Sequence, residues 1–344
     1  SAGVTQTVTA TVQADGTYSV DVPAELAEGE FTVNASVTDE AGNTATTDTA
    51  GEIDTTAPSI TIDTIATGND TTPTLSGTTD AAPGSTVTLT ITDSAGVTQT
   101  VTAIVQADGT YSADVPAELA EGEFTINASV TDEAGNTDTD TGTVVIDTTA
   151  PTVAINDLTT NDTTPELTGT VNDPNAVVVV TIDGNDYTAT NNGNGTWTLA
   201  DNIVALLAEG NYTATVTATD AVGNSDSATG SIVIDTSIDE NNNGQTVTFD
   251  SISNDSGVAG DFITSDSTLI FNGTVDLGDN TTLTVTVDGT SYTFGTDPEL
   301  TIDGSGNWSL DLTGTPLPAG TYAVVATVTD EVGNSASTAS QNVV

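Results

Sequence analysis

The amino-acid sequence predicts an all-β protein made of tandem immunoglobulin-like β-sandwich domains in an extended rod. Three observations lead to this prediction. Short runs alternate apolar and polar residues, turn residues separate these runs about every 8 to 12 positions, and one pattern of about 90 residues recurs along the 344-residue chain. The hydrophobic content of 35% can supply a core to each repeat, which argues against disorder although the formal net charge is −50.

An internal repeat sets the expected domain boundaries. The stretch that begins SAGVTQTVTA at Ser1 returns almost verbatim at Ser94. The phrase IDTTAP occurs at Ile53 and Ile146, and IDTS follows at Ile234. A D-x-x-G-N turn recurs at Asp39, Asp132, Asp220 and Asp330. The predicted repeats, called first to fourth below, are residues 1–54, 55–147, 148–235 and 236–344.

The third repeat shows the expected elements in order. Residues 177–182 form a nearly continuous β-branched run, typical of a strand buried in a sandwich, and residues 212–219 (YTATVTAT) alternate with period two. Seven short strands in about 90 residues are typical of an immunoglobulin-like sandwich. We expect strands near residues 152–156, 166–172, 176–183, 186–191, 196–200, 211–220 and 226–235.

The first repeat is expected to be incomplete, because Ser1 corresponds to Ser94, which follows the third strand of the second repeat. A sandwich without three of its strands exposes apolar faces and unpaired edges. Either the segment was cut from a larger polypeptide, as the lack of methionine also suggests, or the missing strands come from outside this sequence. We favour the first interpretation.

Two aromatic positions recur in the repeats and are predicted to fill the cores. The first follows a glycine turn, and the second lies near the start of the sixth strand. The alternative, a platform for stacking carbohydrate, is less favoured because one large ring at a repeated inward position is typical of a small sandwich. The residues are Tyr18, Tyr111, Trp197 and Trp308 at the first position, and Phe31, Phe124, Tyr212 and Tyr322 at the second.

The composition excludes most chemistry. The chain has no lysine, arginine, histidine or cysteine, so catalytic triads, thiolate nucleophiles, Schiff bases and zinc sites with imidazole or thiolate ligands are excluded. A uniformly negative surface repels nucleic acid and anionic lipid, and no apolar run reaches the roughly 18 residues of a membrane span. We therefore predict a protein that is not an enzyme and has no nucleic-acid partner.

The acidic residues are mainly aspartates, 36 against 14 glutamates, which favours loops and the ligation of hard cations. When a sandwich has its termini at opposite ends, its last strand ends beside the next repeat's loop between strands six and seven. Three carboxylate pairs are therefore expected at junctions, namely Asp54 with Asp132, Asp147 with Asp220, and Asp235 with Asp330. The loop between the first two strands reaches the same end and adds Asp70, Asp162 and Asp266.

These clusters predict calcium. With no cationic side chain in the chain, grouped carboxylates repel one another unless they bind a metal ion, and oxygen-only ligands suit Ca²⁺. The alternative is that the same aspartates form ordinary Asx turns and hairpin ends, where aspartate is common.

One further segment resembles a calcium loop by its spacing. Residues 239–250 (DENNNGQTVTFD) match the ligand positions of an EF-hand-type loop, although the last ligand is aspartate and no helices are expected beside it. The alternative is a polar linker. The candidate ligands are Asp239, Asn241, Asn243, Gln245 and Asp250.

The ordered motifs IDTTAP, NDTTP, G-x-[WY]-[ST], EG-x-[YF] and D-x-x-G-N resemble the bacterial Ig-like repeats of very large surface adhesins, including RTX and biofilm-associated adhesins. The resemblance covers essentially the whole chain. The fourth repeat is similar to a longer variant in the same family. The complete lack of lysine departs from many family members and excludes a Lys–Asn isopeptide bond.

The resemblance implies type I secretion, an extracellular position at a bacterial cell surface, and a role as an extender that holds a ligand-binding tip away from the cell. Calcium at the junctions is also a family trait. Under this hypothesis the partners are calcium ions and neighbouring repeats of one polypeptide, in a monomeric rod. Two alternatives remain, namely direct glycan or protein binding by the fourth repeat, and an acidic cell-wall or surface-layer repeat of a halophile.

Overall fold

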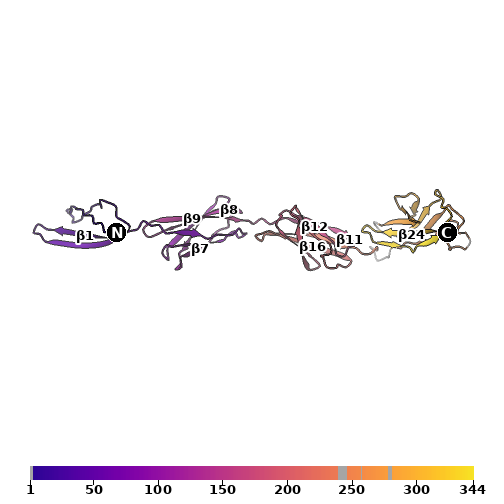
Figure 1. The fold of residues 1–344 in the computed structure, drawn as a ribbon, viewed down its shortest axis with the longest axis horizontal. Helices are drawn as coiled ribbons and strands as arrows, with labels where there is room; N and C mark the ends of the chain where they lie inside the picture. Colours follow the sequence, from indigo (N-terminus) through magenta and orange to yellow (C-terminus); the bar gives the residue numbers. More distant parts are fainter. Residues whose placement is uncertain (1–2, 239–245, 257, 278–280) are drawn as a thin grey trace. The chain divides into compact units, whose positions relative to one another are not determined.

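The computed structural model describes residues 3–238, 246–256, 258–277 and 281–344. It is divided into two units, Ser1–Thr149 and Ala150–Val344, which are described separately. Throughout the described ranges the regular elements are β-strands, and none is a helix (Figure 1). The predicted all-β class is therefore confirmed.

The second repeat is a two-sheet sandwich within the first unit. Its smaller sheet has the order β3-β4-β7, and its larger sheet has the order β6-β5-β8-β9. Phe124, Leu75 and Leu89 are completely buried between the sheets. The strands are β3 (Ile60–Ile62), β4 (Thr74–Thr79), β5 (Thr86–Thr92), β6 (Thr98–Ile104), β7 (Thr110–Asp114), β8 (Gly122–Thr131) and β9 (Thr137–Ile146).

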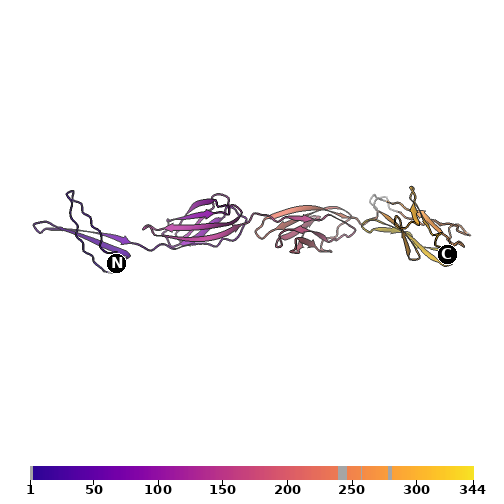
Figure 2. The same cartoon turned by 90° about the horizontal axis from the view of Figure 1, so that it is seen from above.

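The first repeat contains one hairpin in its described residues. Strand β1 (Gly29–Thr38) pairs antiparallel with β2 (Thr44–Ile53), and Gly29 lies opposite Ile53 in the register. Figure 2 shows this hairpin beside an irregular segment, without the layered sheets of a sandwich. None of the residues buried in the described cores belongs to this repeat.

The third repeat confirms the expected strands within one residue at each end and adds a short one. Strand β11 (Leu158–Thr160) pairs in parallel with β17, a contact that periodicity did not predict. Strand β14 pairs with both β13 and β15 and so joins two layers into one sheet, β10-β12-β15-β14-β13-β16-β17-β11. The remaining strands are β10 (Val153–Ile155), β12 (Leu167–Val171), β13 (Val177–Ile182), β14 (Asn185–Asn191), β15 (Thr196–Leu199), β16 (Gly210–Thr219) and β17 (Ser225–Ile234).

The fourth repeat again has two sheets. One has the order β18-β19-β23-β22, and the other has the order β21-β20-β24-β25 with β26 also paired to β24. Phe271 and Trp308 are buried in its core. The strands are β18 (Ser251–Ile252), β19 (Ile270–Thr274), β20 (Thr282–Val287), β21 (Thr290–Thr293), β22 (Leu300–Ile302), β23 (Asn307–Asp311), β24 (Tyr322–Thr329), β25 (Ser335–Ser337) and β26 (Gln341–Val343).

The first aromatic position is a core position in three of the four repeats. Tyr111, Trp197 and Trp308 are buried, and each donates a hydrogen bond to a backbone carbonyl of the first part of its repeat. Each aromatic side chain also lies against a glycine. A Cβ atom there would come within 2.0 to 2.1 Å of the accepting carbonyl oxygen and within 2.4 to 2.7 Å of atoms of the aromatic side chain, which explains why glycine stands there. The acceptors are Thr61 (2.8 Å), Ala154 (2.9 Å) and Thr248 (2.9 Å), and the glycines are Gly77, Gly169 and Gly273.

The core prediction is wrong for Tyr18, which is 57% exposed. In the second repeat the backbone of its counterpart Tyr111 pairs with β4. The Tyr111 hydroxyl donates to the carbonyl of Thr61 in β3. The described residues of the first repeat include no counterpart of these two strands, and the Tyr18 side chain is left largely exposed.

Candidate functional site

The last strand of the second and third repeats ends beside the loop that the sequence predicted there. In the second repeat Asp147 donates its backbone N–H to the carbonyl of Gly68 (2.9 Å), two residues before Asp70. In the third repeat Asp235 donates to the carbonyl of Thr160 (2.8 Å), two residues before Asp162. These parallel contacts therefore bring the first loop of each repeat to the end where its last strand finishes.

The three candidate aspartates in the loop between the first two strands form Asx turns. The Oδ1 atoms of Asp70, Asp162 and Asp266 accept the backbone N–H of the threonine two residues later. The donor–acceptor distances are 2.9 Å to Thr72, 2.8 Å to Thr164 and 2.9 Å to Thr268. The local role that the sequence offered as the alternative to metal ligation is therefore present at all three positions.

Each D-x-x-G-N turn is closed around its aspartate. Oδ1 of Asp330 accepts the backbone N–H groups of Gly333 (2.8 Å) and Asn334 (2.8 Å), and Oδ2 accepts the side-chain amide of Asn334 (2.8 Å). Asp132 and Asn136 repeat this arrangement, with 2.9 Å between Asn136 Nδ2 and Asp132 Oδ2. The Asn136 amide is the main reason that the pKa of Asp132 lies below its usual value.

In the second unit, the Asn334 amide also reaches the end of the third repeat. Its Nδ2 atom donates to the carbonyl of Asp235 (2.9 Å), to Oδ1 of Asp235 (3.3 Å) and to the carbonyl of Ser237 (3.2 Å). The Asn334 side chain therefore lies among four oxygen atoms of Asp235, Ser237 and Asp330. Asp235 and Asp330, which the sequence predicted to meet, share this one donor.

The electrostatics of this junction are unfavourable for anions. Burial raises the pKa of Asp235, and the negative charges of Asp330 and Glu209 raise it further, against one backbone hydrogen bond from Ser237 that lowers it. Two neighbouring carboxylates thus disfavour the charged form of Asp235. Only the neutral amide of Asn334 is seen to bridge Asp235 and Asp330 within the described residues.

In the first unit, the Asn136 amide makes the corresponding contact. It donates to the carbonyl of Asp54 (3.2 Å) and to the carbonyl of Thr56 (3.5 Å). Asp54 therefore meets the turn of Asp132 through its backbone, while its Oδ1 accepts the N–H of Thr56 (3.0 Å).

The third predicted pair is divided between the two units, and its members are described separately. Oδ1 of Asp147 accepts the backbone N–H of Thr149 (3.1 Å) in the first unit. In the second unit Asp220 closes a D-x-x-G-N turn with Asn224, whose Nδ2 lies 2.8 Å from Asp220 Oδ2.

A recurring glutamate at the end of the repeats was missed by the sequence reasoning. In the second repeat Glu121 accepts the hydroxyl groups of Thr148 (2.8 Å) and Thr149 (2.6 Å), 27 and 28 residues downstream. Glu28 accepts those of Thr55 and Thr56, and Glu209 accepts those of Thr236 and Ser237, at the same separations. The constant spacing between the EG-x-[YF] motif and the hydroxyl residues of the linker could have indicated this contact.

The candidate EF-hand-type loop lies mostly outside the described residues, which exclude Asp239, Asn241, Asn243 and Gln245. Asp250 is described. Its Oδ2 accepts the hydroxyl of Thr248 (3.0 Å), and its backbone N–H donates to Asn272 in β19 (2.8 Å). In the ranges that the structure describes, no three acidic side chains are grouped closely enough to hold a metal ion by themselves.

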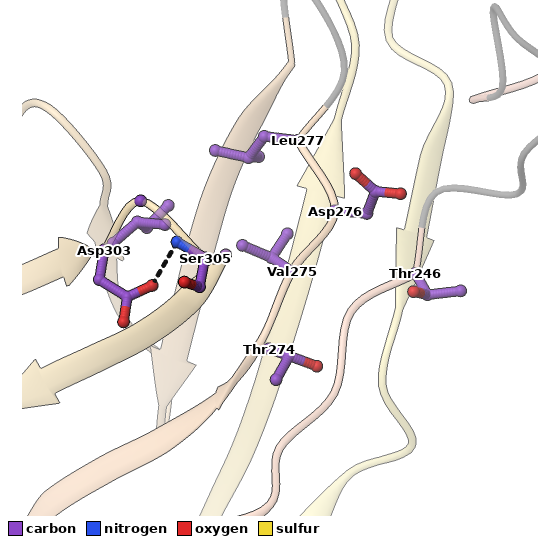
Figure 3. Close-up of a pocket in the computed structure, with 10 residues that line it drawn as sticks. Thr246, Thr274, Val275, Asp276, Leu277, Asp303 and Ser305 are labelled. Atoms are coloured by element: carbon purple, nitrogen blue, oxygen red, sulfur yellow. Dashed lines mark hydrogen bonds between the residues drawn. The ribbon is translucent and has the colours of Figure 1, made fainter.

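The fourth repeat contains an open pocket of about 550 Å³. Figure 3 shows the turn of Asp303 and Ser305 on one side and Thr246 on the other, and Oδ1 of Asp303 accepts the Ser305 N–H (2.8 Å). None of the ten described lining residues is aromatic, so the pocket has no platform on which a sugar ring could stack.

Comparisons with known proteins agree with these features. A family model described as a bacterial Ig-like domain matches four stretches, residues 1–64, 63–148, 152–236 and 244–344. A comparison with curated protein sequences found no match. In the described part of the chain, no helix has the length and apolar character needed to cross a membrane.

Solved structures of adhesion proteins are similar to the chain. A tetra-tandem repeat from the extending region of a large adhesion protein is 31% identical, over 97% of this chain and 87% of that one, with a TM-score of 0.31. A Ca²⁺-stabilised adhesin that helps an Antarctic bacterium reach out and bind ice is 29% identical, over 96% and 85%, with a TM-score of 0.41. By its four family matches, this chain belongs to the bacterial Ig-like domain family.

Proposed function

We propose that the chain is a non-catalytic extender segment of a bacterial cell-surface adhesin, and that calcium restricts the linkers between its repeats. The observation that supports calcium is the junction of Asp235, Asp330 and Glu209. There, the negative charges of Asp330 and Glu209 disfavour the ionised form of Asp235, and a backbone carbonyl oxygen lies beside these carboxylates. The only described group that bridges Asp235 and Asp330 is the neutral side-chain amide of Asn334.

The donor set fits a hard cation. Ca²⁺ takes six to eight oxygen ligands and accepts carboxylates, carbonyls and water together. The Asn334 amide marks where carboxylate and carbonyl oxygens converge, since it lies within 3.3 Å of all four of them. Glu209 would add a further carboxylate from the same repeat as Asp235. The remaining ligands would be water.

The same reasoning extends the proposal to the residues whose metal role the structure does not test. At the first junction, Glu28, Asp54 and Asp132 would take the corresponding places. Asp147, Asp220 and Glu121 are likewise proposed as calcium ligands. The Asx turns of Asp70 and Asp162 use Oδ1, and Oδ2 would be the ligand atom at both positions. At Asp266 a cation would have to replace the side-chain amide of Asn254, which donates to Oδ2. The proposed ligands of the loop from Asp239 to Asp250 are Asp239, Asn241, Asn243, Gln245 and Asp250.

Calcium availability would then control stiffness. At a dissociation constant of about 0.1 to 1 mM, typical of extracellular modules, about 10 mM free calcium stabilises each site by roughly 1.4 to 2.7 kcal/mol. The sites would be empty in a low-calcium cytoplasm and filled after export. This agrees with type I secretion and with a role in adhesion or biofilm formation outside the cell.

Small-angle X-ray scattering of the chain with calcium and with chelator tests the proposal. We expect a larger maximum dimension with calcium, and an unchanged profile would overturn it. Folding that requires molar salt but ignores chelator would instead favour a halophile's surface protein. Direct glycan binding by the fourth repeat gains no support from its pocket, which lacks an aromatic ring.

Matched variants connect the effect to one junction. The double variant D235N/D330N should bind fewer calcium ions in isothermal titration calorimetry and lose part of the calcium-dependent change in scattering. The control D183N/D288N makes the same change of charge at two exposed hairpin turns of the same repeats, and should behave as the parent chain. Equal losses in both variants would mean that general charge, not the junction, controls the response.

A further inference from the structure

One turn of the third repeat differs chemically from its counterparts in the other repeats. It connects β14 to β15 and consists of Asn192, Gly193, Asn194 and Gly195. Both asparagines are exposed. An asparagine that precedes glycine can lose its side-chain amide, because a glycine backbone approaches the side-chain carbon Cγ with little steric hindrance. The turn therefore contains two candidate sites for deamidation, and its hydrogen bonds distinguish them.

The side-chain oxygen of Asn194 accepts two hydrogen bonds from Thr196. The donors are the backbone N–H (3.1 Å) and the hydroxyl (2.7 Å) of that threonine. When a nucleophile attacks Cγ of an asparagine, this oxygen becomes the oxyanion of a tetrahedral intermediate, and donors that are already in place stabilise its charge. The two contacts with Thr196 therefore favour attack on Asn194.

The nucleophile beside Asn194 is the backbone nitrogen of Gly195. In each of the other three repeats, the corresponding glycine donates its N–H to the carbonyl of the residue three positions earlier. These bonds are Gly16 to Gln13 (3.0 Å), Gly109 to Gln106 (3.0 Å) and Gly306 to Asp303 (3.1 Å). Within the part of the chain that the structure describes, the Gly195 N–H makes no hydrogen bond. Its nitrogen can therefore be deprotonated and attack without the loss of a backbone contact.

The other Asn-Gly pair of the turn has neither advantage. The amide nitrogen of Asn192 donates to two threonine hydroxyls of β15, at 2.9 and 3.2 Å, and among the described residues no group donates to its Oδ1. The N–H of Gly193, which would be the nucleophile here, donates to Oδ1 of Asn191 (3.1 Å). Asn192 should therefore react more slowly than Asn194.

The fold also accommodates the aspartate that deamidation would create at position 194. Asp15 and Asp108 occupy the same place in the first and second repeats. Each accepts the N–H and the hydroxyl of the threonine two residues later, at 3.0 and 2.8 Å for Asp15 and at 3.1 and 2.7 Å for Asp108. An aspartate in the third repeat would therefore keep the hydrogen bonds of the present turn.

We propose that Asn194 is a site of spontaneous deamidation, and that the fold of the third repeat directs the reaction to this asparagine. Hydroxide removes the proton of the Gly195 N–H, and the nitrogen forms a bond to Cγ of Asn194. The Cγ–Nδ2 bond then breaks, and Nδ2 takes a proton from water and leaves as ammonia, which regenerates hydroxide. A cyclic succinimide remains.

Hydrolysis of the succinimide completes the modification. Water that adds at Cγ breaks the new Cγ–N bond and gives aspartate, whereas water that adds at the backbone carbonyl carbon gives isoaspartate. Either product adds a negative charge to the third repeat. The proposal is independent of calcium and of the extender role, because it depends only on contacts within one turn.

Incubation of the full chain at mildly alkaline pH, followed by peptic digestion and mass spectrometry, tests the proposal. Digestion at low pH limits further deamidation, since the reaction requires hydroxide. In the folded chain we expect Asn194 to react at least about threefold faster than Asn192, because only Asn194 has donors for the oxyanion. In a synthetic peptide of residues 188–198, which cannot form the sheet, the two rates should be similar. Equal rates in the folded chain would overturn the proposal.

Variants of two threonines in β15 test the donors. Thr196→Val removes the hydroxyl that donates to Asn194 and should slow its deamidation at least about threefold, whereas Thr196→Ser should keep the parent rate. The matched control is Thr198→Val, which removes a hydroxyl that contacts only Asn192 and should leave Asn194 unchanged. Unaltered tryptophan fluorescence would show that each variant is folded. A folded Thr196→Val chain that deamidates at the parent rate would contradict the proposed role of Thr196.

Discussion

Residues 3–53 and 96–146 have closely related sequences but different structures. In the second repeat, Thr98–Ile104 and Thr110–Asp114 are strands β6 and β7. Residues 5–11 and 17–21, which correspond to them, form no strand. The second repeat pairs β6 with β5 and β7 with β4, and the described residues of the first repeat contain no equivalent of β4 or β5.

Several local contacts are the same in both repeats. Gln6 exchanges two hydrogen bonds with the backbone of Ala24, at 3.0 Å each, just as Gln99 does with Ala117. The turn of Asp15 and Thr17 matches that of Asp108 and Thr110. Short-range turns are therefore encoded in the local sequence, whereas a strand requires the partner across the sheet.

The largest predicted effect comes from completing the first repeat. A copy of residues 55–93 joined ahead of Ser1 should convert residues 1–54 into a sandwich and add a cooperative unfolding transition worth about 5 kcal/mol or more, because a full core is then buried. Differential scanning calorimetry would measure it. The same fusion with Gly77→Val in the added copy should lose the transition, because a side chain there would meet the carbonyl of Thr61 and the aromatic side chain, and a transition that persists would mean that the completed repeat does not pack as the second repeat does.

The second prediction compares two equivalent tyrosines. Tyr111→Ala should destabilise the second repeat by about 3 to 5 kcal/mol, because a large buried ring is removed. Tyr18→Ala should change stability by less than about 0.5 kcal/mol, because its ring is exposed. Urea denaturation of the two variants measures both values. Similar losses would mean that the environments of the two rings do not differ in solution.

The third prediction compares two equivalent asparagines. Asn43 and Asn136 both donate to the aspartate of their own turn, but Asn136 also donates to the carbonyls of Asp54 and Thr56. Asn136→Ala should therefore speed hydrogen exchange in the linker at residues 55–57 and destabilise it by about 1 kcal/mol. Asn43→Ala should leave these amides unchanged, and an equal effect of both variants would limit the role of Asn136 to its own turn.

The smallest predicted effect is in titration. The side-chain amides of Asn43 and Asn136 hold the pKa values of Asp39 and Asp132 below the usual value, whereas burial and neighbouring charge raise the pKa of Asp235. The first two groups contribute stability above their unfolded pKa, and it is lost as pH falls through their lowered values. Asp235 acts oppositely, because its contribution is complete only below its unfolded pKa and is lost as pH rises through the raised value. Carboxyl chemical shifts in an NMR titration would check all three directions, and a lowered value for Asp235 would contradict the description of its junction.

Much of the fold could be predicted because its signals are local. The strand ends of the third repeat follow from alternation and turn residues, and the glycine of each complete sandwich stands where a ring must pass close to the backbone. Strand β11 was missed since its three residues are too few for periodicity to indicate. The glutamates of the linkers were missed because their hydroxyl donors are 27 and 28 residues away.

The sequence by itself determined the repeats, the turns and the absence of cationic side chains, because each is a property of residue type and spacing. Only the tertiary structure decided which of two nearly identical segments forms strands and which carboxylates share a donor. Strand pairing and the burial of Tyr111 depend on residues far along the chain. The conformational entropy that is lost when such residues come together is offset only when a complementary sheet is present. In the described part of the first repeat no such sheet lies beside Tyr18, and its side chain is exposed.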